Sequence, residues 1–316
     1  MNNTHLILEK IKKINNIVVI SQEFEAAYKG ILLCSEKNYI YKKSYGCLLL
    51  ANGGLGKTTI CNSIVRKNPP YEKIENNIKK TIIPVFYLEI PSPATVKSVA
   101  SSMLKALNDP APLKGTTTQL TYRLIYLLKE CETKLIFMDE FHHLFDLQIT
   151  TKRMNTVVCN WIKTLVDETK ICFCLVGLPE FSPLLKIDSQ LARRFSHSFY
   201  LNNLSINKLN EYGTIHAFLE QIEIYIAHNL EINFEPTLTN QLLALQIYVA
   251  TSGNQAYLML LIENCIFRVL TRGSNIITRE DFVNAWDEGI TSYVSKTIVN
   301  PFHLDISSLS TKIKNN

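Results

Sequence analysis

The chain has 316 residues, 47% of them hydrophobic, and its formal net charge is +5. This length and hydrophobic content are enough to bury a full core, and a main domain with a smaller one is the most natural division. No stretch approaches the roughly eighteen apolar residues of a membrane span, and charged residues occupy the N-terminus where a signal peptide would be apolar. Both observations predict a cytoplasmic protein without membrane contact. The eight cysteines show no paired C-x-x-C spacing, which argues against a zinc site and favours reduced thiols. The mild positive charge permits contact with a nucleic-acid backbone but does not demonstrate it.

A glycine-rich turn between a strand and a helix is the first functional element along the chain. The apolar run at 45–50 predicts a strand buried on both faces, and helical spacing follows from Thr59. Small residues in such a turn let backbone N–H groups converge on a β-phosphate, while a lysine balances the phosphate charge and a hydroxyl reaches Mg²⁺. Ala51 replaces the usual first glycine of the pattern, and a turn without a ligand is the alternative. We expect a P-loop that binds ATP and Mg²⁺ through Asn52, Gly53, Gly54, Leu55, Gly56, Lys57, Thr58 and Thr59.

Strand and helix patterns alternate through the next part of the chain. Further β-rich apolar runs occur at 82–90, 134–139, 171–177 and 196–201, and helical spacing separates most of them, as at 94–107 and 119–131. This alternation predicts an α/β fold of the P-loop NTPase type, with a five-stranded parallel sheet flanked by helices.

The apolar run at 134–139 ends in two adjacent carboxylates. An aspartate at the end of such a strand can support Mg²⁺, and the next acid can polarise the attacking water. Asp139 takes the first role and Glu140 the second, with Lys57 as the other catalytic residue of the same subunit and Thr58 as the second metal ligand. The alternative is that the two acids only cap the helix that follows.

Strand signals become rare after Leu204, and apolar faces with helical spacing take over at 206–228, 236–250, 254–270 and 279–293. This pattern predicts a small all-helical lid domain behind the ATPase core. The expected division is therefore an N-terminal helical segment, the core, the lid and a weakly structured tail, at residues 1–44, 45–203, 204–295 and 296–316.

Four motifs together resemble the TniB/TnsC family of AAA+ ATPases of DNA transposons. They are the P-loop and the segments DEFHHLFD at 139–146, LVGLPE at 175–180 and QLARRF at 190–195, and the resemblance runs from about residue 20 to residue 290. It implies an ATPase that assembles with itself, as a ring or a helix, on double-stranded DNA when ATP is bound. It also implies that the assembly links a target-selection protein of the TniQ type to a transposase.

The resemblance implies that Arg194 is an arginine finger, with Arg193 as the fallback, reaching the γ-phosphate held by a neighbouring subunit. Two adjacent arginines near a helix end can instead satisfy C-terminal carbonyls. His142 matches a family position, but it is not expected to be catalytic. Val176 and Gly177 stand where AAA+ proteins often have a polar sensor, and the segment at 253–256 lacks the lid arginine. Slow, oligomer-dependent hydrolysis is therefore expected.

The resemblance implies non-specific DNA contacts through Lys97, Lys114, Thr116, Thr117 and Thr118. Lysines and hydroxyls position a backbone without reading its sequence, so site choice would come from a partner. The alternative is that Lys97 is a solvated surface charge and that the threonines cap the next helix.

Two other functions remain open from the sequence. The first is a helicase loader or replication initiator of related fold. The second is a nucleotide-dependent scaffold with little turnover, against which Glu140 argues.

Overall fold

The computed structural model describes residues 2–14, 17–145, 152–183, 188–206 and 213–314. Asp146 and residues 207–212, which fall within two of the segments discussed above, lie outside the described residues. The chain forms two compact units. We call them the core unit, residues 23–53 and 57–201, and the helical unit, residues 1–22, 54–56 and 202–316.

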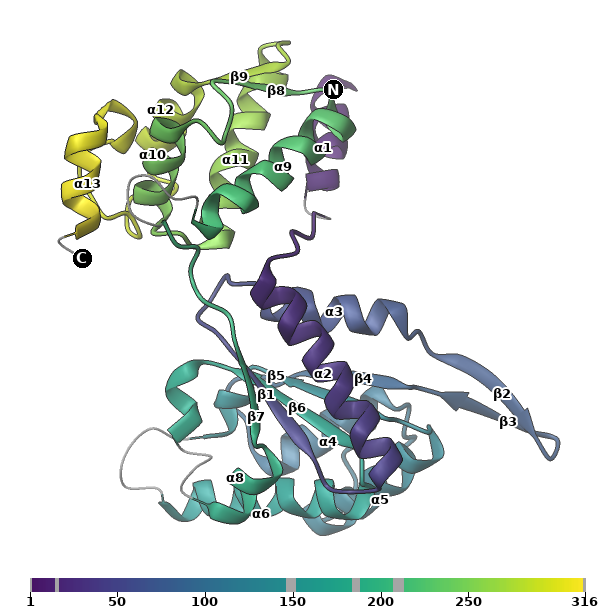
Figure 1. Ribbon diagram of the computed structural model, residues 1–316. Coiled ribbons are helices and arrows are strands. Elements are labelled where there is room, and N and C mark those ends of the chain that lie inside the picture. The colour runs from purple at the N-terminus through teal and green to yellow at the C-terminus, as the bar shows by residue number, and fades with distance from the viewer. Residues whose placement is uncertain (1, 15–16, 146–151, 184–187, 207–212, 315–316) are drawn as a thin grey trace. The chain divides into compact units, whose positions relative to one another are not determined.

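A five-stranded parallel sheet forms the centre of the core unit (Figure 1). Its order is β4-β5-β6-β1-β7, and all neighbouring strands pair in parallel. β1, β5 and β6 are buried along their whole length because helices cover both faces. The predicted α/β P-loop fold is confirmed, with strands β1 (Gly46–Leu50), β4 (Val85–Glu89), β5 (Leu135–Asp139), β6 (Cys172–Gly177) and β7 (His197–Tyr200).

Alternate side chains of the central strands point into two different layers. Those of Leu48, Ile136 and Phe173 join one apolar cluster with α4 (Val96–Ala106), α5 (Thr117–Glu130) and α6 (Lys152–Thr169). On α2 (Gln22–Tyr41), Gly30 lies so close to the Phe199 ring of β7 that an added Cβ would lie 2.2 Å from a ring carbon. α2 therefore packs tightly against the edge of the sheet.

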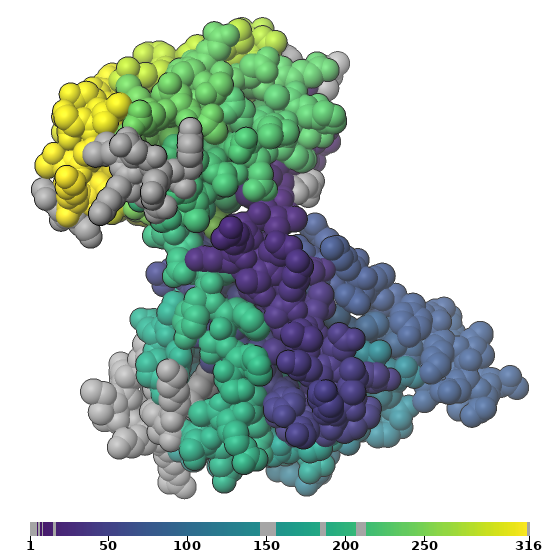
Figure 2. All heavy atoms as spheres, in the orientation of Figure 1, coloured from purple at the N-terminus to yellow at the C-terminus, as the bar shows by residue number. Residues whose placement is uncertain are grey.

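A β-hairpin that the sequence analysis did not predict precedes β4. It consists of β2 (Tyr71–Glu75) and β3 (Ile78–Ile82), which pair in antiparallel fashion and project from the core unit (Figure 2). Ile74 is 75% exposed, and exposed lysines and glutamates form ion pairs along the hairpin. The apolar pattern at 82–90 is therefore divided, because β3 ends at Ile82 and the buried strand β4 begins only at Val85.

The helical unit is built around a main apolar core, and a smaller second cluster joins α10 to α13. Its elements are α1 (Asn2–Ile14), α9 (Thr214–Leu230), α10 (Gln241–Thr251), α11 (Gln255–Thr271), α12 (Arg279–Asp287) and α13 (Ile306–Lys314). The N-terminal segment was expected to lead into the ATPase core. Instead, α1 belongs to the helical unit, where Ile7, Ile11 and Ile14 are buried with residues of α9 and α11.

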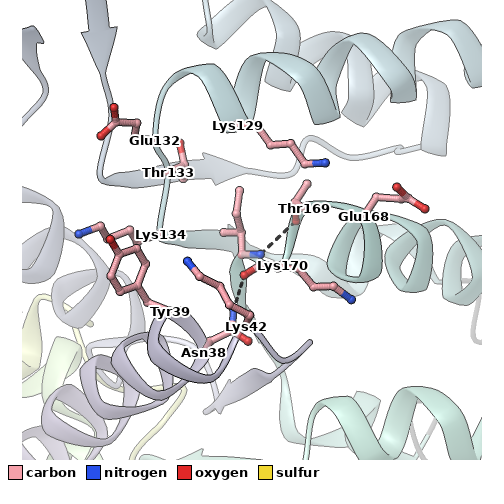
Figure 3. Close-up of a pocket in the computed structure, with 11 residues that line it drawn as sticks. Asn38, Tyr39, Lys42, Lys129, Glu132, Thr133, Lys134, Glu168, Thr169 and Lys170 are labelled. Atoms are coloured by element: carbon pink, nitrogen blue, oxygen red, sulfur yellow. Dashed lines mark hydrogen bonds between the residues drawn. The ribbon is translucent and has the colours of Figure 1, made fainter. Parts of the chain in front are cut away.

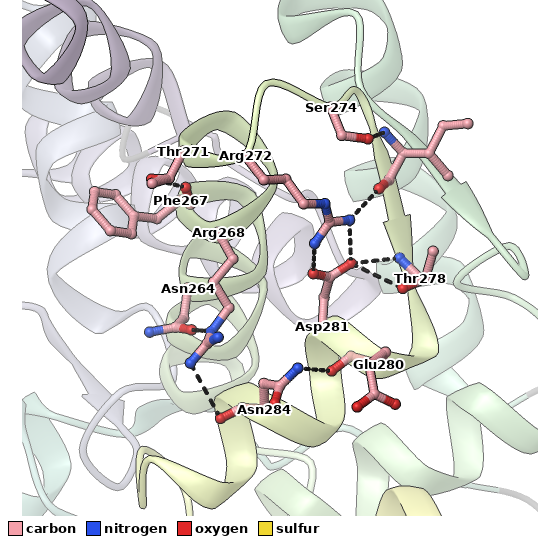
Figure 4. A network of polar contacts seen from close by, with 11 residues as sticks. Asn264, Phe267, Arg268, Thr271, Arg272, Ser274, Thr278, Glu280, Asp281 and Asn284 are labelled. Atoms are coloured by element: carbon pink, nitrogen blue, oxygen red, sulfur yellow. Dashed lines mark hydrogen bonds and ion pairs between the residues drawn. The ribbon is translucent and has the colours of Figure 1, made fainter.

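The helical unit is not purely helical. Asn233–Glu235 (β8) and Ile276–Thr278 (β9) form a short parallel ladder. β9 leads directly into α12, where Thr278 forms a capping box with Asp281. Asp281 is buried and accepts hydrogen bonds from both terminal nitrogens of the Arg272 guanidinium (Figure 4). This ion pair joins the end of α11 to the start of α12.

The tail was predicted to be weakly structured, but in the structure it is ordered as far as α13. Phe302, in a 3₁₀ turn at Pro301–His303 (η4), is fully buried, and Leu309 of α13 is fully buried against α10. The buried Gln246 amide donates to the carbonyls of Phe302 and Leu304 over 3.2 and 3.0 Å. Ile306, Leu309 and Ile313 recur at the i, i+3 and i+7 spacing of a helix, and they pack the tail against α10.

Within the described residues, the helices lack the combination of length and apolar content that a membrane span requires.

Candidate nucleotide-binding site

The glycine-rich turn joins the end of β1 to the start of α3 (Lys57–Lys67). Gly54 and Gly56 have φ values of +77° and +88°, which non-glycine residues adopt only with strain. These two glycines turn the backbone so that α3 starts at Lys57, with its positive N-terminal end beside the turn. The Leu55 side chain is buried, so its backbone is the part available to a ligand.

Lys57 lies folded into the turn. Its Nζ donates to the carbonyl oxygens of Ala51 and Asn52 over 2.8 and 3.1 Å. Burial lowers the pKa of Lys57, while the nearby carboxylates of Glu140 and Asp139 oppose that shift. The two carbonyl oxygens thus hold the ammonium group beside the turn, and a bound anion could take their place as its partner.

Thr58 and Asp139 meet at the ends of two elements that are distant in sequence. Thr58 Oγ1 donates to Asp139 Oδ2 over 2.8 Å, and the Tyr87 hydroxyl of β4 donates to the same oxygen over 2.9 Å. Asp139 is almost fully buried, and burial together with this carboxylate raises the pKa of Tyr87. A threonine hydroxyl and a carboxylate are hard oxygen donors, so the pair fits Mg²⁺. Tyr87 has no functional signal in the sequence, because only the β4–β5 pairing brings it to Asp139.

Glu140 follows Asp139 with a left-handed backbone, at φ +52° and ψ +37°. This turn ends β5 and starts a short 3₁₀ helix at Phe141–Leu144 (η1). The Glu140 side chain is 31% exposed, and its Oε2 lies 3.2 Å from His142 Nδ1. His143 Nδ1 lies 2.8 Å from the carbonyl oxygen of Ile90. Glu140 therefore has a carboxylate open to solvent beside the P-loop.

The two candidate arginines differ in their surroundings. Both end α8 (Ser189–Arg194). The Arg194 guanidinium binds Asp167 of α6 with Nε at 2.9 Å and Nη2 at 2.6 Å, and its Nη1 donates to Gln190 O. A side-chain hydrogen bond from Arg194 holds the pKa of Asp167 below its usual range. Arg193 is exposed and forms no ion pair within the described part of the chain.

The predicted DNA-contacting residues lie around the start of α4 and the start of α5. Thr116 is the N-cap of α5, where it forms a capping box with Gln119, so the capping alternative holds for this residue. Thr117 and Thr118 belong to the first turn of α5, and Thr118 is exposed. Lys97 and Lys114 are both exposed.

The link that carries Lys114 is held by an arginine that the sequence analysis did not single out. Arg123 pairs with Asp109 through Nε at 3.0 Å and donates to the carbonyls of Ala111 and Lys114. Beside this link lies a hollow of about 630 Å³, formed by Lys97, Lys105, four hydroxyl residues, Pro112 and Leu113. Lys105 is therefore a further basic candidate at this surface.

A second hollow, of about 510 Å³, lies at the opposite, amino-terminal ends of β5 and β6 (Figure 3). Lys42, Lys129, Lys134 and Lys170 line it with Tyr39. The ammonium groups of Lys42 and Lys134 lie over the Tyr39 ring, at 4.4 and 4.3 Å from its centroid. Parallel strands present their ligand sites at their carboxyl ends, so this hollow is separate from the nucleotide site.

A family model described as "Bacterial TniB protein" matches residues 36–203, which contain the P-loop, β5 with its two acids and both candidate arginines. No protein with a curated description matches the chain.

Several solved structures share the fold at low sequence identity. The Orc1 protein of Aeropyrum pernix in complex with DNA is 14% identical with a TM-score of 0.58, and the match covers 85% of this chain and 66% of that one. Cdc6p of Pyrobaculum aerophilum is 12% identical with a TM-score of 0.53, and the match covers 77% of this chain and 60% of that one. A RuvB variant of Thermotoga maritima is 15% identical with a TM-score of 0.50, and the match covers 85% of this chain and 70% of that one.

This chain therefore spans 66% and 60% of the length of the Orc1 and Cdc6p chains. Together with the sheet and the helical unit, these similarities show the fold of AAA+ P-loop ATPases.

Proposed function

This chain belongs to the TniB family, and from that premise we propose that it is an ATP-dependent regulator of DNA transposition that binds duplex DNA without sequence preference. The observation that carries the nucleotide part of the proposal is the hydrogen bond between Thr58 and Asp139. It unites the turn after β1 and the end of β5, the two places where a P-loop ATPase holds phosphate and metal.

Each side chain of the site has a distinct proposed role. The turn at 52–56 binds the phosphates through its backbone, Lys57 balances their charge, and Thr58 and Asp139 hold Mg²⁺. When bound, Mg²⁺ neutralises charge on the phosphate oxygens. Glu140 accepts a proton from the attacking water, for which its partly exposed carboxylate is suited.

Two substitutions test the nucleotide site separately for binding and turnover. Lys57→Ala should abolish binding of a fluorescent ATP analogue. Glu140→Gln should bind the analogue as wild type does, but its phosphate release should fall at least about 100-fold, because general-base catalysis typically contributes that much. Normal binding by Lys57→Ala would refute the P-loop assignment. Unchanged phosphate release by Glu140→Gln would refute the role of Glu140.

An oligomer is proposed because the core unit offers an exposed arginine at its surface. Arg193 is exposed, whereas Arg194 is held by Asp167 within the same subunit. Arg193 is accordingly the better finger for a neighbour's γ-phosphate, in place of Arg194, and an arginine in that role stabilises transition-state charge. Turnover that depends on a neighbour would be slow in the isolated subunit.

DNA binding is proposed through Lys97, Lys114 and the hydroxyls of Thr116, Thr117 and Thr118. Lys105, which lines the hollow together with Lys97, is added to this surface. The Orc1 protein of similar fold was solved in complex with DNA, which is consistent with this proposal. Lysines and hydroxyls would bind backbone phosphates, so a TniQ-type target selector would choose the insertion site and the assembly would connect it to the transposase.

The DNA proposal predicts a change in the salt dependence of binding. Replacing both Lys97 and Lys114 with alanine should weaken binding equally across sequences, and should reduce the slope of log K against log salt by about two, since each lysine contributes about one unit. A matched control is the double replacement of Lys42 and Lys129, which lie in the other hollow. An unchanged slope for the Lys97 and Lys114 variant would dismiss this surface.

A replication initiator or helicase loader is the alternative function. The similarity to Orc1 and Cdc6p concerns the fold alone, at 14% and 12% identity. The family match favours transposition. Recruitment of a replicative helicase, without any effect of the protein on transposition of a cognate element, would support the alternative.

A further inference from the structure

The carboxyl end of β6 lies between the two strands that carry the nucleotide site. In the sheet order β4-β5-β6-β1-β7, β6 separates β5, which ends at Asp139, from β1, which leads into the P-loop. A polar side chain at the end of β6 would thus lie between the P-loop and the acidic strand end. The residue at this position is Gly177, which pairs with Leu50 of β1 and has no side chain.

His142 occupies the space in front of Gly177. A Cβ built on Gly177 would lie 3.6 Å from His142 Nδ1 and 3.7 Å from the His142 backbone nitrogen. The imidazole is also held from its other sides, because it packs against the Phe181 ring at 5.0 Å and the His143 ring at 4.4 Å between centroids. A side chain longer than that of alanine at position 177 would compete with the ring for this space.

The Nδ1 atom of His142 is buried and makes no hydrogen bond within the described part of the chain. It nevertheless lies 3.2 Å from Glu140 Oε2, which is within reach of a hydrogen bond. A small rotation of either side chain would complete a hydrogen bond, and an unsatisfied buried nitrogen favours that rotation. Glu140 is the residue whose orientation would then be set.

We propose that His142 is the positioning residue for Glu140 and supplies, from η1, the polar group that β6 lacks at Gly177. This inference rests on the proposed ATPase function and deepens it. As the Nδ1–H tautomer, the imidazole donates to Glu140 Oε2 and leaves Oε1 to accept the proton of the attacking water. Glu140 has a left-handed backbone and its Oε2 lies 3.2 Å from His142 Nδ1, close enough for the two residues to act as one unit.

The experiment compares two replacements of His142 with a replacement of its neighbour. In His142→Asn the amide nitrogen can take the place of Nδ1, whereas His142→Leu keeps the volume without a donor. His143→Leu is the matched control, since the His143 Nδ1 contacts the Ile90 carbonyl. ATP turnover is measured with and without duplex DNA, ATP-analogue affinity is measured separately, and thermal unfolding reports on folding.

His142→Leu should lower kcat by about 10- to 100-fold with KM for ATP within about twofold, as expected for a misplaced general base. His142→Asn should recover most of that loss, and His143→Leu should change stability more than kcat. The proposal is overturned if His142→Leu keeps the wild-type kcat, or if His142→Asn turns over no faster than His142→Leu.

Two further results distinguish the positioning role from metal binding and from a failure of the proposed ATPase function. The donor atoms of Glu140, His142 and His143 lie within 4.8 Å of one another, as they would in a metal site. Stoichiometric zinc in the purified protein that is lost in His142→Asn would overturn the positioning role in favour of metal binding. If the wild type shows no ATP turnover, and is therefore no faster than Lys57→Ala, the result refutes the proposed ATPase function itself.

Discussion

The hydroxyl of Thr58 donates a hydrogen bond to Asp139 Oδ2 over 2.8 Å, although 81 positions separate the two residues in sequence. The contact joins the first turn of α3 to the end of β5, and it brings two side-chain oxygens together at the carboxyl end of the sheet. The geometry is local to the core unit and depends on β5, β6 and β1 being consecutive in the sheet.

The first prediction concerns this hydroxyl. Thr58→Val keeps the shape of the side chain but removes an Mg²⁺ ligand, so the Mg²⁺-dependent gain in ATP affinity should fall at least about tenfold. Thr58→Ser retains the hydroxyl and should remain within about threefold of wild type by the same reasoning. Titration of a fluorescent ATP analogue with Mg²⁺ and with EDTA measures both. Equal Mg²⁺ dependence in Thr58→Val and wild type would contradict the metal assignment.

The second prediction separates the adjacent arginines of α8. Arg193→Ala should leave stability unchanged and reduce oligomer-dependent turnover by at least about 100-fold, because an arginine finger contributes that much or more. Arg194→Ala should lower the free energy of unfolding by about 1 kcal/mol, since it breaks a partly exposed bidentate pair with Asp167. Mixing each variant with Glu140→Gln subunits tests whether the arginine acts on a neighbour. Loss of turnover confined to Arg194→Ala would restore that residue as the finger.

The third prediction concerns the ion pair between Arg272 and Asp281 in the helical unit (Figure 4). Burial would raise the pKa of Asp281, but the Arg272 guanidinium and the Thr278 backbone N–H hold it below its usual range. Arg272→Ala leaves this buried carboxylate without its cation and should cost about 3 kcal/mol of unfolding free energy. Chemical denaturation at neutral pH measures the loss, and an unaltered midpoint would show that the pair contributes nothing.

The same ion pair predicts a pH dependence. The folded-state pKa of Asp281 is lower than its unfolded value of about 3.9. Its contribution to stability is therefore fully present above that unfolded value and is lost as the pH falls through the folded-state pKa. The stability difference between wild type and Asp281→Asn should be constant from neutral pH to about pH 5 and should shrink below about pH 4. A difference that grows on acidification would contradict the assigned direction.

The fourth prediction concerns the tail. Leu309 of α13 is fully buried against α10, so Leu309→Ala should lower the free energy of unfolding by about 2 to 4 kcal/mol. Ile313 is only partly buried at the same contact, and Ile313→Ala should cost about 1 kcal/mol or less. Equal, negligible effects in thermal unfolding would show that the tail does not stabilise the helical unit.

The parts of the fold that were predicted depend on short-range patterns. Residues 45–58 contain a buried strand, a turn that requires glycine at two positive φ angles, and the start of a helix, all in consecutive residues. Apolar runs likewise located all five strands of the sheet. Such features are visible in sequence because steric limits and burial act on neighbouring residues.

The hairpin and the ordered tail were not predicted, although each has a local signal. Asn76 and Asn77 form the two-residue turn of the hairpin at positive φ, and Ile306, Leu309 and Ile313 recur at helical spacing in the tail. The hairpin alternates exposed lysines and glutamates with few buried residues, and the tail is anchored mainly by Phe302 and Leu309. The hairpin is held by local antiparallel pairing, whereas the tail depends on contacts with the distant helix α10.

The sequence by itself determined the phosphate-binding turn, the two acids at the end of β5 and the family, since each is a property of consecutive residues. Only the tertiary structure decided that Tyr87 binds Asp139, that Asp167 holds Arg194, and that His142 stands before Gly177. Strand order brings these partners together, and strand order follows from the packing of the entire core. The free energy of that packing is shared among many residues, so it leaves no signal at any single position.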